Sequence, residues 1–78
     1  MSEFDQFVSI ASWALSEKSI GYRSVAEKFG LNVNDATRHV HNMVRQHLCC
    51  QCYSTHTKEV AFAVNKKECE EYLLEFDR

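Results

Sequence analysis

The segment from residue 33 to residue 47 carries polar side chains whose chemistry suits a DNA duplex. Asn can bond adenine in a bidentate way, Arg can do the same with guanine, and Thr can contact a base edge or a phosphate. At helical spacing six such side chains share one outer face: Asn34, Thr37, Arg38, His41, Asn42 and Arg45. We expect Asn34, Thr37 and Arg38 to read bases, because the first half of such a helix enters the major groove. Arg45, two turns further on, is expected to contact phosphate.

Two flanking segments are expected to add contacts. Arg23, Ser24 and Lys28 precede the reading segment and can clamp the phosphate backbone. The short polar turn over residues 54–60, with Lys58 near its tip, can reach a phosphate or the minor groove as a wing. The alternative for this wing is a tight turn with no binding role, and the sequence leaves both possibilities open.

The charge distribution supports this placement, although the net charge of the chain is −2. Residues 1–17 contain three acids and no base, residues 18–58 have a net charge of +4, and residues 59–78 have a net charge of −3. The basic centre coincides with the expected reading unit, and local charge sets the field that a nearby phosphate experiences. The acidic last helix would repel DNA and is expected to face away from it.

Helix-boundary residues predict how the reading segment is positioned. Ser24 is expected to cap a helix with Glu27 as its capping-box partner, and Gly30 to end it in a left-handed conformation. Asn32 is then expected to cap the next helix, which should run to about residue 47. Its predicted buried face is Val33, Ala36, Val40, Met43 and Val44. The alternative is a plain helical hairpin with a solvated polar face.

The remaining pattern predicts the elements around this helix-turn-helix. A helix over 3–17 should bury Phe4, Phe7 and neighbouring apolar residues, with a short strand following near 19–22. Alternating residues predict strands over 49–54 and 60–65, and apolar spacing predicts a last helix over 66–76. The predicted fold is mostly α (α+β): a winged helix-turn-helix with a three-helix core, a two-stranded wing and a C-terminal helix, forming a single domain over 1–78.

The four cysteines admit three interpretations. Cys50 and Cys52 share one strand face, and Cys69 can approach them if the last helix packs on the sheet. Zinc requires about four ligands, whereas the Cys-x-Cys spacing is unusual for zinc and lacks a second pair. Free cysteines are often buried as small apolar residues, which is the interpretation we favour for these four, Cys49 included. A metal site and a redox switch are the alternatives, and we predict no cofactor and no bound metal.

Several classes of protein are not expected. Apolar runs are too short for a membrane span, and the acidic N-terminus differs from a signal peptide, so we expect a cytoplasmic protein. No nucleophile, base and acid have catalytic spacing, so we do not expect an enzyme. The expected partner is double-stranded DNA, with a homodimer or another regulatory protein as further partners. The alternative function is a protein-interaction module that acts through the first helix or the acidic last helix.

Short motifs resemble one known family. They are Ile10-Ala11-Ser12-Trp13-Ala14, the segment from Val25 to Leu31, and Cys50-Gln51-Cys52. In these the chain resembles the small enterobacterial winged-helix transcriptional regulators of the CaiF/GrlA type. The resemblance implies sequence-specific DNA binding and transcriptional activation in a bacterium.

Overall fold

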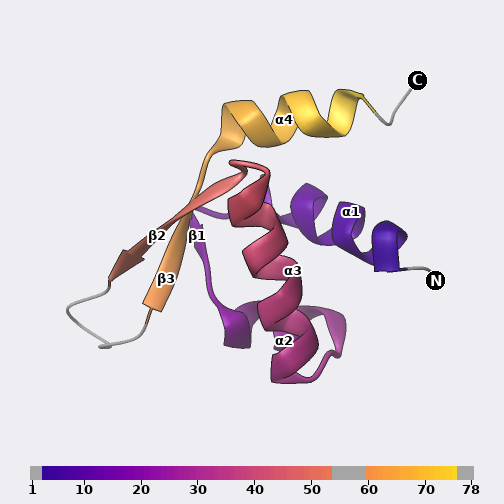
Figure 1. The fold of residues 1–78 in the computed structure, drawn as a ribbon, viewed down its shortest axis with the longest axis vertical. Coiled ribbons are helices and arrows are strands. Elements are labelled where there is room, and N and C mark those ends of the chain that lie inside the picture. Colours follow the sequence, from indigo (N-terminus) through magenta and orange to yellow (C-terminus); the bar gives the residue numbers. More distant parts are fainter. Residues whose placement is uncertain (1–2, 54–59, 76–78) are drawn as a thin grey trace.

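The computed structural model describes residues 3–53 and 60–75, which form four helices and three strands (Figure 1). In chain order the elements are α1 (Glu3–Ala14), β1 (Ser19–Ile20), α2 (Tyr22–Phe29), α3 (Val33–Arg45), β2 (Cys49–Tyr53), β3 (Val60–Val64) and α4 (Lys66–Leu74). The order and type of these elements agree with the sequence prediction. In the described residues the helix expected to end at residue 17 is shorter, because the chain turns after Ala14.

The three strands form an antiparallel sheet in the order β1-β3-β2. Cys49 lies opposite Val64 and Tyr53 opposite Val60, while Ser19 of β1 lies opposite Ala63. The short strand β1 therefore ties the region before α2 to the hairpin. This helix, helix, turn, helix and hairpin arrangement is a mostly helical winged-helix fold.

The core lies where the helices meet the inner face of the sheet. Its fully buried members include Ile10, Val25, Val40, Met43 and Phe62. The periodicity was misleading for Phe4 and Val33, which were expected in the core but are 51% and 55% exposed. Both lie in the first turn of a helix. Periodicity predicts the direction of a side chain there, but not whether another element is close enough to cover it.

The turn between α2 and α3 has the expected local chemistry. Gly30 has a φ of 65° and ends α2, and the Asn32 side chain accepts a hydrogen bond from the Asp35 N–H at 2.8 Å. The start of α2 differs from the prediction: the helix begins at Tyr22, and Gly21 rather than Ser24 is its N-cap. Ser24 is instead the third residue of the helix, and its hydroxyl forms hydrogen bonds with the backbone of Gly21.

The arrangement in space separates the acidic helix from the helix-turn-helix. In Figure 1, α3 stands beside α1 and crosses α2 in the lower part of the view, while α4 lies at the end of the molecule opposite to α2 and packs against α1. The β2–β3 hairpin projects to one side of the helices. No helix within the described ranges has the length and apolar character needed to cross a membrane.

Candidate nucleic-acid interface

The outer face of α3 carries four exposed polar side chains, opposite the buried Ala36, Val40 and Met43. They are Asn34, Arg38, His41 and Arg45. The other two predicted residues, Thr37 and Asn42, are half-buried at the margins of this face. The Thr37 hydroxyl donates a hydrogen bond to the Val33 carbonyl at 2.7 Å, so only its lone pairs are left for another partner.

Arg38 is held by carboxylates on the side of α3 that faces α1. Its guanidinium forms ion pairs with Glu3 at the start of α1 and, at 3.0 Å, with Asp35 one turn earlier. The Arg38 side chain remains 55% exposed. A guanidinium in this position must leave or share these carboxylates before it can bond a base.

Tyr22 lies beside the outer face of α3 and was not among the predicted site residues. Its hydroxyl lies 2.8 Å from His41 Nε2, and its ring makes edge contacts with the rings of His41 and Phe62. Tyr22 thereby connects the start of α2, the outer face of α3 and β3. The Gly21-Tyr22-Arg23 sequence predicts this contact only if the helix begins at Tyr22, because that start places Tyr22 in the first turn of α2.

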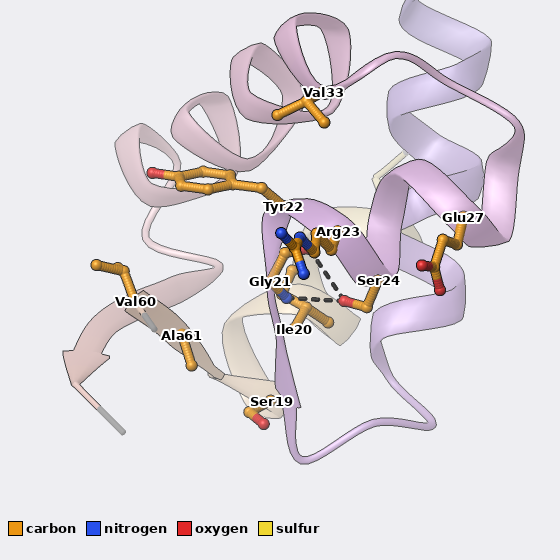
Figure 2. Close-up of a pocket in the computed structure, with 10 residues that line it drawn as sticks. All are labelled: Ser19, Ile20, Gly21, Tyr22, Arg23, Ser24, Glu27, Val33, Val60 and Ala61. Atoms are coloured by element: carbon orange, nitrogen blue, oxygen red, sulfur yellow. Dashed lines mark hydrogen bonds between the residues drawn. The ribbon is translucent and has the colours of Figure 1, made fainter. Parts of the chain in front are cut away.

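An open groove of about 770 Å³ lies beside the start of α2 (Figure 2). It is bordered by β1, the first turn of α2, Val33 at the start of α3, and Val60 and Ala61 of β3. Arg23 lines this groove, but so does the acidic Glu27. The Ser24 hydroxyl accepts from the Gly21 N–H at 2.8 Å and donates to the Gly21 carbonyl at 3.0 Å, so its proton is already engaged.

The other predicted contacts are more dispersed. Lys28 is exposed on the last turn of α2 and does not line the groove. Lys58 and the rest of the 54–59 turn lie outside the described residues, so the wing contact stays a prediction. The structure therefore brings the α3 residues, Tyr22 and Arg23 to one side, whereas Lys28 stands apart from the groove.

The cysteines separate into two pairs. Cys49 and Cys69 are buried, whereas Cys50 and Cys52 are exposed. Burial raises the pKa of Cys49 to about 11, and the pKa of Cys69 is also raised, chiefly by burial. The expectation of buried thiols is confirmed for Cys49 and Cys69 and is wrong for Cys50 and Cys52, which are exposed because they lie on the outer face of β2. Cys69 is buried against α1, where its thiol donates a hydrogen bond to the Ala11 carbonyl at 3.2 Å. Among the described residues no group of three His, Cys, Asp or Glu side chains is arranged to hold a metal ion.

His39 is buried on the inner side of α3 and is 3% exposed. Its Nε2 lies 3.3 Å from Gln6 Oε1, its ring stacks on Phe7, and its Nδ1 has no hydrogen-bond partner among the residues that the structure describes. Burial lowers the His39 pKa, and nearby Arg38 lowers it further, while the carboxylates of Glu3 and Asp35 act in the opposite direction. His39 thus belongs to the packing of α3 on α1 rather than to the outer face.

Comparison with known proteins gives one informative similarity. No protein-family model matches the chain. No curated protein matches it significantly either. Among solved structures, a MarR family protein from Bacillus stearothermophilus is similar, with a TM-score of 0.68 and 25% sequence identity. The match covers 91% of this chain and 50% of that chain, so this chain spans about half the length of its structural neighbour.

Proposed function

We propose that this protein is a DNA-binding transcriptional regulator that inserts α3 into the major groove. The observation that carries the proposal is the outer face of α3, where Asn34, His41 and Arg45 are exposed on one side of a helix whose other side is core. In winged-helix and helix-turn-helix proteins the second helix of the unit is the element that enters the groove. The fold similarity to a MarR family protein supports a DNA-binding regulator in general terms.

Individual roles follow from chemistry and position. Asn34 and Thr37 lie in the first half of α3 and contact base edges, and Arg38 joins them when it leaves its carboxylate partners. His41, Asn42 and Arg45 lie further along the helix. Arg45 contacts phosphate, as do Arg23 and Lys28 of α2 and Lys58 of the wing. The helix α4 lies at the end of the molecule opposite to α2 (Figure 1), so its exposed acids are expected to oppose contacts made by α2 and the first half of α3 least.

The experiment is a fluorescence anisotropy titration of labelled duplex DNA over a series of salt concentrations. Each phosphate contact contributes about 0.9 to the slope of log K against log salt concentration. Arg45→Ala should therefore weaken binding and reduce the slope by about 0.9. Lys67→Ala, which removes one positive charge from exposed α4, is the matched control and should change neither quantity. Equal effects of the two substitutions would reject α3 as the contact element.

A protein-interaction role is the second candidate, and one observation favours it. Phe4 near the start of α1 and Leu74 near the end of α4 are large apolar side chains that are 51% and 63% exposed. Both helices have these ends on the same side of the molecule (Figure 1). A homodimer or a regulatory partner can cover this end, and a dimer suits a reader of paired half-sites. Loss of dimer mass in Leu74→Asp by sedimentation, with DNA contacts of the monomer retained, would support this candidate.

A further inference from the structure

Strand β2 has an unusual combination of an open edge and accessible thiols. In the sheet order β1-β3-β2 it is an edge strand, and its sequence from Cys49 to Tyr53 has no charged residue and no Pro. Natural edge strands commonly carry such residues because they discourage pairing with another chain. Two strands of this sequence placed together would therefore bring no like charges into opposition.

The backbone groups of β2 show which residues face the open edge. The Asn65 N–H donates to the Leu48 carbonyl at 2.8 Å, in register with the pairing of Cys49 and Val64. Because alternate residues bond the same neighbour in an antiparallel ladder, Cys50 and Cys52 direct their backbone groups toward β3. The backbone N–H and C=O groups of Cys49, Gln51 and Tyr53 are then directed toward the open edge.

The exposed thiols have no suitable disulfide partner within the described part of the chain. Residues two apart in a strand are separated by about 6.6 Å with parallel side chains. A disulfide requires Cβ atoms only about 4 Å apart, so Cys50 cannot join Cys52 without distorting β2. Cys49 points to the opposite face of the strand by alternation, and both Cys49 and Cys69 are buried. A disulfide bond at Cys50 or Cys52 must therefore use a thiol of a second molecule.

We propose that Cys50 and Cys52 form a redox-sensitive site that links two copies of this chain through their β2 edges. In a two-fold antiparallel pair centred on Gln51, Cys50 of each copy lies opposite Cys52 of the other. These positions are non-hydrogen-bonded pairs, whose Cα atoms are about 4.5 Å apart, within the range for a disulfide. This register overlaps all five residues of β2 and forms two equivalent bridges.

The chemistry balances with a small-molecule disulfide such as oxidised glutathione as the oxidant. The Cys50 thiolate attacks one sulfur of oxidised glutathione, forms a mixed disulfide and releases one glutathione thiolate. The Cys52 thiolate of the second copy attacks the Cys50 sulfur and releases the second glutathione. Formation of each bridge thus oxidises two protein thiols and reduces one molecule of oxidised glutathione. The two bridges together consume two molecules of oxidised glutathione.

The test asks whether Cys50 of one copy forms its disulfide with Cys52 of the other copy. The full chain, Cys50→Ser and Cys52→Ser are each incubated folded with oxidised glutathione and examined by non-reducing electrophoresis and intact mass. Neither substitution touches the core, and circular dichroism checks the fold. The unsubstituted chain should give a covalent dimer that a reductant dissolves, and each variant alone should lose it. Mixing a tagged Cys50→Ser with an untagged Cys52→Ser should restore a heterodimer, because one Cys52–Cys50 pair is then complete.

Denatured samples of the same variants provide the control, because any remaining cysteines can cross-link once the chains unfold. A covalent dimer of folded Cys50→Ser alone would overturn the proposed register. Oxidation of the unsubstituted chain to glutathione adducts without dimer, or failure of the mixed variants to cross-link, would overturn the proposed site.

Discussion

Lowering the pH should destabilise the protein through His39, and the structure sets the sign of the effect. Burial holds the pKa of His39 below its ordinary value of 6.5, so the folded protein keeps this ring neutral. Below pH 6.5 the unfolded chain takes up a proton that the folded chain does not. The stability contributed by the neutral ring is therefore complete above pH 6.5 and is lost as the pH falls toward the folded pKa. One proton changes the free energy of unfolding by at most about 1.4 kcal/mol per pH unit.

The assay is urea unfolding followed by circular dichroism at several pH values between 7.5 and 5.5. Other groups also titrate, so the informative quantity is the difference between the protein and His39→Gln, which cannot protonate but keeps an amide donor near Gln6. The variant at His39 should lose less stability with falling pH than the unsubstituted protein does. An unchanged pH slope in His39→Gln would refute the reasoning.

Three further predictions concern the helix-turn-helix. Asn32→Ala should lower the free energy of unfolding by about 1 kcal/mol, because it removes the 2.8 Å cap bond from the Asp35 N–H. Asn65→Ala should lower it less, because the cap bond that Asn65 accepts from the Glu68 N–H is 3.4 Å long. Thermal melts compare the two variants, and equal losses of stability would contradict the argument. Gly30→Ala should cost about 1 kcal/mol in the same assay because its φ is 65°. Glu3→Gln should strengthen DNA binding by removing one of the two carboxylates that hold Arg38. Weaker binding in anisotropy titrations would show that the Glu3–Arg38 pair helps the interface.

The sequence predicted the parts of the fold that depend on neighbours in the chain. Gly30 and Asn32 were assigned correctly because a left-handed residue and a cap side chain act within one turn of backbone. Ser24 was misplaced because a serine can cap a helix or bond back from its third position, and only the course of the chain distinguishes these roles. Local chemistry therefore identified the turn but not every helix end.

The sequence pattern did not predict contacts between residues that are far apart in the chain. The ion pair of Arg38 with Glu3 joins residues 35 positions apart, and nothing in either segment indicates it. The alternation of β2 correctly put Cys50 and Cys52 on one face, but it did not show that helices cover the opposite face. The expectation of buried thiols was therefore wrong for Cys50 and Cys52, which lie on the exposed face.

Nuclear magnetic resonance detection of the amide groups during titration with duplex DNA tests the central proposal most directly. The account predicts that the shifts concentrate at the start of α2 and along α3 from Asn34 to Arg45, and that amides of α4 around Lys67 stay unchanged. Shifts that cluster on α1 and α4 while the α3 amides stay unchanged would contradict α3 as the DNA-reading helix.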